Sequence, residues 1–174
     1  MKLLTLCLLF IGIFFTQSSQ AARYNSDCHG NSCMQYGWNV QQMGGHYQSN
    51  TQCVNGGCSQ GGWQTYDNAG YQVSVHCYQG GCFRAGWSGQ VFTNGMTYYE
   101  QGLCWGGNCL RNGWRIQTNW GIQDVVCLNG DCARFGWESR RVNGVSRTYC
   151  KNGDCFRFGW VTDVWGSRAQ SCSL

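Results

Sequence analysis

Apolar and polar positions alternate in the segments that end on a tryptophan. Counted from a recurring cysteine, the first, third and fifth positions carry mainly aromatic side chains, as in Phe156, Phe158 and Trp160. Alternation with a period of two predicts β-strands that bury one face, and no stretch shows helical periodicity. We expect this aromatic stripe to form the core face of a sheet; a row of platforms for a stacked ligand is the alternative.

The alternating segments belong to a repeat. Six copies of Cys-x4-Cys-x3-Gly-Trp follow one another at intervals of 23 to 27 residues, and Cys172 begins a seventh copy that the chain end cuts short. Such a period predicts one repeat domain over residues 22–174. The paired cysteines are Cys28 and Cys33, Cys53 and Cys58, Cys77 and Cys82, Cys104 and Cys109, Cys127 and Cys132, and Cys150 and Cys155.

Turn dipeptides mark both ends of each repeat. Asn129-Gly130 and similar pairs stand between the two cysteines, where a type I′ turn would bring the cysteines within disulfide distance. A second turn signal, such as Asn143-Gly144, lies between each tryptophan and the next cysteine. The sequence therefore predicts six local disulfides and an all-β antiparallel meander of about twelve strands, either solenoid-like or closed into a barrel. Zinc is the weaker alternative, because zinc knuckles favour two intervening residues.

The N-terminus predicts export. Met1 and Lys2, the apolar run 3–15 and the small residues before Ala22 predict a removable signal peptide over residues 1–21, with no membrane span. The remaining thirteen cysteines favour an oxidising extracellular or periplasmic compartment. Cys172 is left unpaired, which predicts a disulfide-linked homodimer, a free thiol or the stub of a degenerate repeat.

Charge is scarce but regularly placed. The chain has 11% charged residues and a net charge of +4, or +3 without Lys2, which is too little to predict a nucleic-acid partner. Four arginines recur at the second position after the second cysteine, and on a sheet they would stand about 9–10 Å apart opposite the aromatic stripe. We consider them a candidate anion-binding row, with ordinary solvated side chains as the alternative. They are Arg84, Arg111, Arg134 and Arg157.

Two acidic residues bear on that row, since Asp131 and Asp154 are expected to pair with Arg134 and Arg157.

Aromatic residues in predicted turns form a second candidate binding feature, because an exposed ring can stack on a sugar or a lipid headgroup. The alternative is that each ring folds back as a lid over its own hairpin. The four candidates are Tyr78, Trp105, Trp120 and Trp165.

Nothing in the spacing predicts catalysis. The three histidines and eight carboxylates do not recur with the repeat, and Glu100 is interpreted as a hydrogen-bonding group on the sheet surface. Evenly repeated features suit binding at several weak sites. We expect a secreted, non-enzymatic, lectin-like protein without cofactor or metal that binds a glycan or an anionic surface polymer. The alternative is an effector, coat or structural module that docks an acidic surface through the arginine row.

One segment carries a family resemblance. Gly86-Trp87, the run Asn94-Gly95-Met96-Thr97-Tyr98-Tyr99 and Gly113-Trp114 resemble the hairpin repeats of bacterial cell-wall-binding modules of the choline-binding type. That resemblance implies hairpins stacked into a solenoid, with choline held in aromatic cages between them. The asparagine-glycine and tyrosine spacing is also similar to MORN repeats, which are arrays of hairpins of about this length.

Overall fold

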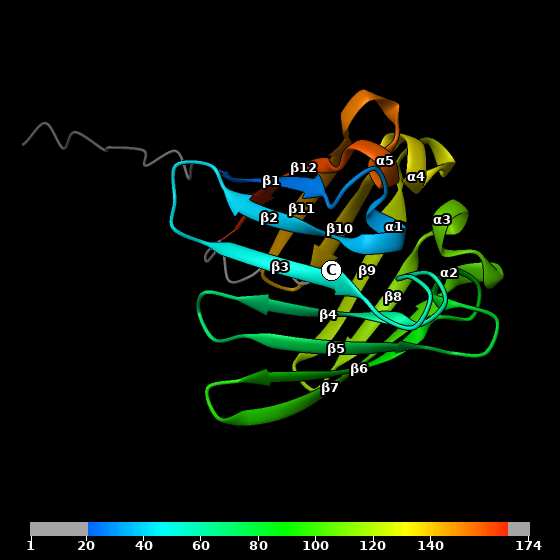
Figure 1. Cartoon of the computed structure of the whole chain (residues 1–174), viewed down its shortest axis with the longest axis horizontal. Coiled ribbons are helices and arrows are strands. Elements are labelled where there is room, and N and C mark those ends of the chain that lie inside the picture. Colours follow the sequence, from blue (N-terminus) through cyan, green and yellow to red (C-terminus); the bar gives the residue numbers. More distant parts are fainter. Residues whose placement is uncertain (1–20, 167–174) are drawn as a thin grey trace, which may run out of the picture.

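The computed structural model describes residues 21–166 and shows a closed barrel of twelve antiparallel strands (Figure 1). Each strand pairs with its neighbours in sequence, and β1 pairs with β12 to close the sheet. The strands are β1 (Ala22–Cys28), β2 (Gly37–Gln42), β3 (Gln48–Cys53), β4 (Gly62–Asp67), β5 (Gln72–Cys77), β6 (Trp87–Thr93), β7 (Met96–Cys104), β8 (Trp114–Thr118), β9 (Gly121–Cys127), β10 (Trp137–Arg141), β11 (Gly144–Cys150) and β12 (Trp160–Trp165). The predicted all-β meander is thus confirmed as a barrel and not as an open solenoid.

All six predicted disulfides are present. Their Cα–Cα distances are 4.3 to 4.5 Å, and each bond joins cysteines five positions apart. Each lies in a connection that we call a tip, which runs from the first cysteine of a repeat to its tryptophan. Residues 1–20 of the signal peptide predicted over residues 1–21, and the unpaired Cys172, lie outside the described residues. None of the helices between residues 21 and 166 has the length and apolar composition needed to cross a membrane.

The turns within the tips follow the expected chemistry in four of the six repeats. Asn55, Gly106, Asn129 and Asn152 have φ values of 48° to 56°, and each is followed by a glycine with φ of 70° to 92°. Two successive positive φ values define the type I′ turn. In the third tip only the second central residue, Gly80, has a positive φ of 99°, but the backbone hydrogen bond from Gly81 to Tyr78 keeps the turn at the same position.

The prediction that a strand begins directly after each second cysteine is wrong. In five tips the second cysteine opens a single helical turn, and the strand begins only at the Gly-Trp pair. One turn of helix is too short to produce a hydrophobic period, which is why the alternation was misleading. The helices are α1 (Cys33–Tyr36), α2 (Cys82–Ala85), α3 (Cys109–Asn112), α4 (Cys132–Phe135) and α5 (Cys155–Phe158).

The glycine before each tryptophan ends the helical turn. Its φ lies between 80° and 103° in all six tips, a region that residues with a Cβ rarely adopt. A Cβ at Gly136 would lie 2.0 Å from the carbonyl oxygen of Thr148 on the following strand, and the other five glycines have equivalent contacts at 2.0 to 2.1 Å. These glycines are buried, so they pack the tips against the barrel and leave no gap for a ligand.

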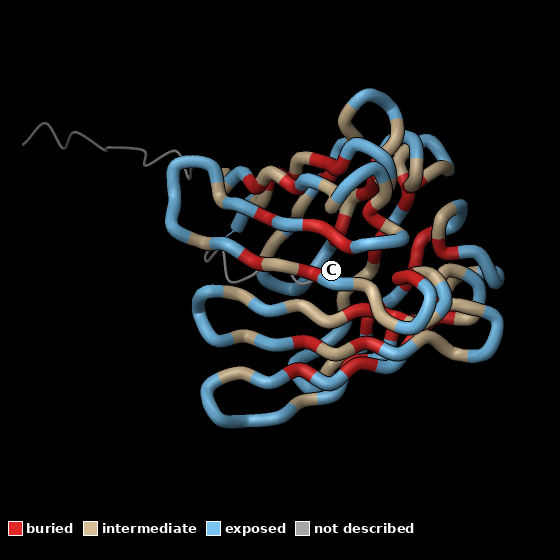
Figure 2. The backbone as a smooth tube through the Cα atoms, viewed as in Figure 1, coloured by how far each residue is buried: buried red, intermediate tan, exposed pale blue. Residues whose placement is uncertain are grey.

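The core lies inside the barrel, near the end that carries the tips (Figure 2). Beneath the tryptophans the strands point mostly small side chains inward. Some of these are polar and satisfy one another, as in the hydroxyl pair of Thr148 and Thr162 at 2.8 Å. Thr51 and Thr65 form the same contact, also at 2.8 Å, in the second repeat.

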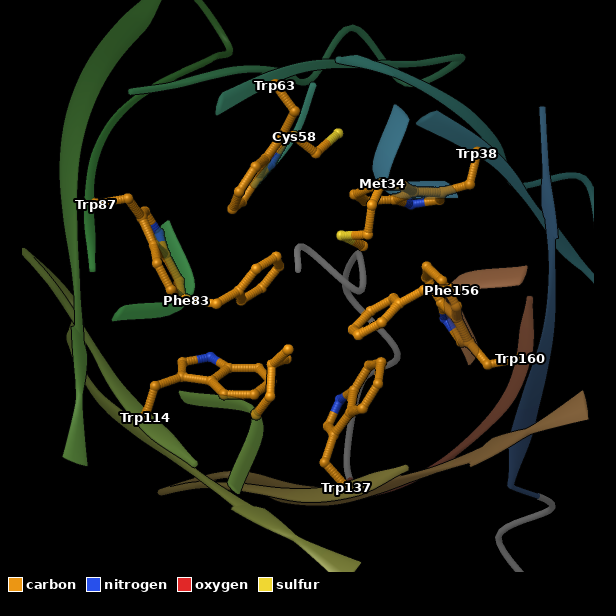
Figure 3. A pocket seen from close by; sticks show the side chains of 11 residues that line it. Met34, Trp38, Cys58, Trp63, Phe83, Trp87, Trp114, Trp137, Phe156 and Trp160 are labelled. Carbon is orange, nitrogen blue, oxygen red and sulfur yellow. The ribbon is translucent and has the colours of Figure 1, made fainter. Parts of the chain in front are cut away.

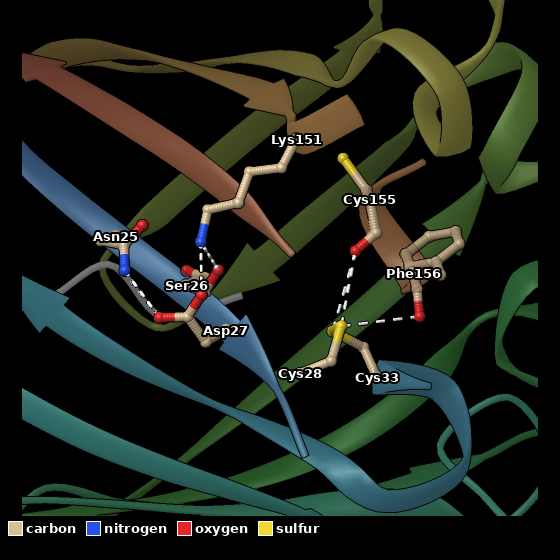
Figure 4. Close-up of polar contacts among 8 residues, drawn as sticks. All are labelled: Asn25, Ser26, Asp27, Cys28, Cys33, Lys151, Cys155 and Phe156. Atoms are coloured by element: carbon tan, nitrogen blue, oxygen red, sulfur yellow. Dashed lines mark hydrogen bonds and ion pairs between the residues drawn. A yellow bond between two sulfur atoms is a disulfide. The ribbon is translucent and has the colours of Figure 1, made fainter. Parts of the chain in front are cut away.

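The seam between the first and last repeats is closed by polar contacts (Figure 4). Lys151 donates to the backbone oxygen of Ser26 at 2.7 Å and forms an ion pair with Asp27. Further along the seam, Arg23 binds the Asp163 carboxylate in a bidentate pair at 2.6 and 3.0 Å. These contacts tie the two ends of the repeat array together.

Each tip also touches its neighbour. The Cys28 sulfur lies 3.6 Å from the carbonyl oxygen of Phe156 in the last tip (Figure 4), and the other first cysteines make similar contacts to the preceding tip. A disulfide sulfur has no proton to donate, so these are packing contacts and not hydrogen bonds. Together they link the six tips into a ring.

Candidate binding site

The four repeated arginines lie on four consecutive helices at the tip end of the barrel. Arg84 is on α2, Arg111 on α3, Arg134 on α4 and Arg157 on α5. Neighbouring helices of this series contact one another around the rim (Figure 1), and all four side chains are exposed. The predicted row on a strand face is therefore corrected to an arc on the rim, which we call the arginine arc. The two remaining tips carry Gln35 and Gln60 at the equivalent position.

Within the described residues, none of the arc arginines forms an ion pair. The ion pairs elsewhere in the barrel use Arg23, Arg115, Arg140, Arg147 and Lys151. In these pairs the arginine lowers the pKa of the carboxyl: hydrogen bonds from Arg115 do so for Asp124, and hydrogen bonds from Arg147 and Arg140 do so for Glu138. The arc arginines therefore remain available to an external partner.

Asp131 and Asp154 do not pair with arginine side chains as expected. Each carboxylate caps its own helical turn: Asp131 accepts a hydrogen bond from the backbone N–H of Arg134 at 3.0 Å, and Asp154 accepts from the N–H groups of Phe156 and Arg157. The corresponding caps before Arg84 and Arg111 are the uncharged Gly81 and Asn108. Positive potential is therefore least compensated at Arg84 and Arg111.

A closed ring of six tryptophans lies inside the barrel beneath the arc. Successive ring centroids are 5.4 to 6.4 Å apart, and neighbouring planes are tilted by 52° to 63°. These are favourable geometries for aromatic pairs. Since all six indoles are buried, the expectation that they form the core is confirmed. They are Trp38, Trp63, Trp87, Trp114, Trp137 and Trp160.

An apolar cavity of about 40 Å³ lies inside the tryptophan ring (Figure 3). Four side chains that follow second cysteines point into it, namely Met34, Phe83, Leu110 and Phe156. Phe83 and Phe156 come from opposite repeats and meet with ring centroids 5.8 Å apart. The third position after the cysteine turns outward instead, so that Phe158 is 40% exposed.

The four aromatic candidates are divided between the two ends of the barrel. Tyr78 and Trp105 are half-buried in the tips, and the Tyr78 hydroxyl accepts a hydrogen bond from Gln101 at 2.9 Å. Trp120 and Trp165 lie at the opposite end of the barrel, Trp120 in the turn between β8 and β9 and Trp165 at the end of β12. Trp120 is 60% exposed and packs against Tyr98 with centroids 4.1 Å apart. The structure therefore does not bring these residues together into one site.

The prediction that Glu100 lies on the sheet surface is wrong. The residue is buried inside the barrel. Burial raises the pKa of its carboxyl to about 7, against the opposing effects of the Trp87 indole and the Arg141 charge. Its Oε1 has no hydrogen-bond partner among the described residues. The register contains the missed signal, since counting back by twos from Cys104 reaches Gly102 and then Glu100 on the inward face.

Fold and site define a closed twelve-stranded antiparallel barrel with six disulfide-closed tips, a basic rim and an aromatic mouth. Comparisons with protein-family models, with curated proteins and with solved structures found no match for this chain. Across residues 21–166, no three histidine, cysteine, aspartate or glutamate side chains are grouped as metal ligands would be.

Proposed function

We propose that the protein is a secreted, non-enzymatic binding protein that attaches to an anionic glycan or a similar anionic surface polymer through the arginine arc. One observation carries this proposal: four exposed arginines lie on adjacent helices and have no ion-pair partner among residues 21–166. Guanidinium groups suit carboxylates and sulfates, because their planar donors match both oxygens of an anion.

Secretion is part of the same proposal. It is supported by the apolar segment at residues 3–15, which follows Lys2. Six disulfides are also compatible with an extracellular location, since reducing compartments rarely maintain them.

The test compares dextran sulfate with uncharged dextran. Replacing Arg84, Arg111, Arg134 and Arg157 with glutamine introduces the residue that the first two tips already carry. If each exposed contact contributes about 0.5 kcal/mol, the affinity for dextran sulfate should fall about 30-fold and lose most of its salt dependence. Dextran itself should not bind.

A control variant removes the same charge elsewhere. Glutamine at Arg23, Arg115, Arg140 and Arg147 changes the arginines that already have carboxylate partners, and affinity should change less than about threefold. Equal losses in the two quadruple variants would show that only net charge matters and would contradict the proposal. Within the arc, the Arg84→Gln, Arg111→Gln double variant should lose more affinity than the Arg134→Gln, Arg157→Gln variant, because Asp131 and Asp154 already offset the latter pair.

A second candidate function is stacking of a neutral sugar on Trp120. One face of this indole packs on Tyr98, and 60% of the residue is exposed. Trp120→Ala should then abolish binding to uncharged glycans on an array while leaving dextran sulfate binding unchanged. An array without any neutral glycan signal would remove this candidate.

A further inference from the structure

The cavity inside the tryptophan ring has no polar side chain in its lining. Its walls are the six indoles together with Met34, Cys58, Phe83, Leu110 and Phe156 (Figure 3). A water molecule in such a space needs two to four polar partners. The indole N–H group of Trp63 is buried without a partner among the described residues, and the lining side chains offer it no oxygen or nitrogen acceptor. The cavity therefore favours an apolar occupant over water.

The mouth above the cavity is only partly closed. Large side chains at the first position after the second cysteine cover it from four tips, and Phe83 and Phe156 meet over its centre. The remaining two tips carry Ser59 and Ala133 at this position, which are too small to reach across. Ala133 lies on α4, which carries Arg134 and contacts α3 with Arg111, so an entrance at this position would be flanked by two exposed arginines.

Apolar lining and basic rim together specify one kind of ligand. We propose that the cavity binds the chain end of a free, single-chain anionic amphiphile, an alkyl carboxylate, whose headgroup is held by the arginine arc. This inference rests on the proposed function only in that the same arginines bind the anion. The volume of about 40 Å³ admits the end of one chain and excludes a second, which favours a free alkyl carboxylate over a two-chain lipid.

The orientation of the chain can be measured directly, because bromine quenches indole fluorescence on contact. The probes are decanoate with bromine on the last carbon and decanoate with bromine next to the carboxylate, both used below the concentration of micelle formation. The chain-end bromine should quench saturably and strongly, whereas the bromine beside the carboxylate should quench weakly. Equal quenching by both probes would overturn the proposal.

Two variants separate the cavity from the rim. Ala133→Phe places at this tip the residue that the third and sixth tips carry, and it should abolish the quenching while dextran sulfate binding stays unchanged. Arg111→Gln with Arg134→Gln should weaken binding of the probe about fivefold but preserve the preference for chain-end bromine. Hexanoate, octanoate and decanoate should bind with affinities that rise about fourfold for each additional methylene buried, until the cavity is full.

The remaining arms address other occupants and the relation to the proposed function. Quenching seen only in a chain that ends at Gly166 would show that residues 167–174 block the cavity in the whole protein. Binding to anionic vesicles without binding to free decanoate would show that this face binds a membrane. Either result overturns the inference. Dextran sulfate binding without chain-end quenching sinks this inference alone. Chain-end quenching without dextran sulfate binding sinks the proposed polymer-binding function alone.

Discussion

Glu100 on β7 lies directly against Gly89, the residue opposite it on β6. A Cβ on Gly89 would come within 2.6 Å of Glu100 Cγ and 3.0 Å of Oε1. The absence of a side chain at this one position thus leaves room for a carboxyl group inside the barrel. The carboxyl is buried near the Trp87 indole, where water solvates its charge poorly.

The first prediction concerns the dependence of stability on pH. Burial raises the pKa of Glu100 from 4.5 to about 7, so the folded protein keeps a proton that the unfolded chain has already lost. The contribution of Glu100 to stability is therefore complete below pH 4.5 and is lost as the pH rises towards 7. Glu100→Gln should stabilise the protein by up to about 3 kcal/mol at pH 8 and change little at pH 4. Urea unfolding at both pH values measures the difference.

Glu138 supplies the control for that experiment. Hydrogen bonds from Arg147 and Arg140 lower its pKa, so its stabilising effect is present above the unfolded pKa and disappears as the pH falls through the lower folded value. Glu138→Gln should therefore destabilise the protein at pH 8 and have little effect at very low pH. The same pH response in both variants would contradict the assignment of Glu100.

The second prediction tests the glycines that end the helical turns. Gly136→Ala would place a Cβ 2.0 Å from the Thr148 carbonyl oxygen at a φ of 92°, and it should destabilise the barrel by more than about 3 kcal/mol. Gly153→Ala has the same positive sign of φ, 71°, but nothing within 4 Å. It should cost only about 1–2 kcal/mol. Thermal unfolding of the two variants separates steric contact from conformational preference.

The third prediction uses the buried hydroxyl pair of Thr148 and Thr162. Thr148→Val leaves the Thr162 hydroxyl without its partner and should cost about 1–3 kcal/mol. Adding Thr162→Val removes the unsatisfied group and should recover most of that loss, because the third repeat already carries Val75 on its inward face. A double-mutant cycle measures the coupling, and additive effects would show that the hydroxyls do not depend on each other.

The fourth prediction concerns a single disulfide. Replacing Cys104 and Cys109 together with alanine opens a small loop and should destabilise the protein by about 2 kcal/mol, the loop-closure entropy of so few residues. The other five disulfides should still form, because each joins cysteines within its own tip. Peptide mapping without reduction checks the pairing, and scrambled partners would contradict the local scheme.

The disulfides and turns could be predicted from the sequence because they depend on residues close together in the chain. Cysteine spacing and central turn dipeptides predicted all six disulfides, and the second set of turns predicted twelve strands. The helical turns of α1 to α5 were missed because four residues cannot show a period. The tryptophans were placed correctly because the fifth position after the cysteine does lie on a strand, even though the first three positions do not.

Non-local features could not be predicted in the same way. Closure of the barrel depends on β1 pairing with β12, and no local pattern encodes that contact. The arginines lie on the rim because they belong to the helical turns. Missing those turns therefore also placed the arginines on the wrong surface. Glu100 is the exception, because counting back by twos from Cys104 already places it on the inward face, and the pairing of β7 with β6 and β8 agrees with that register.

The seam has a consequence for the order of folding. Eleven of the twelve strand pairings join neighbours in sequence, whereas β1 and β12 meet across almost the whole described chain, with Arg23 and Asp163 separated by 140 positions. Contacts at long sequence separation form slowly, because the chain between them must first lose its freedom. Hairpins and disulfides can therefore mature one by one from the N-terminus, and docking of the last strand on the first is expected to be the slow, cooperative step that produces the native barrel.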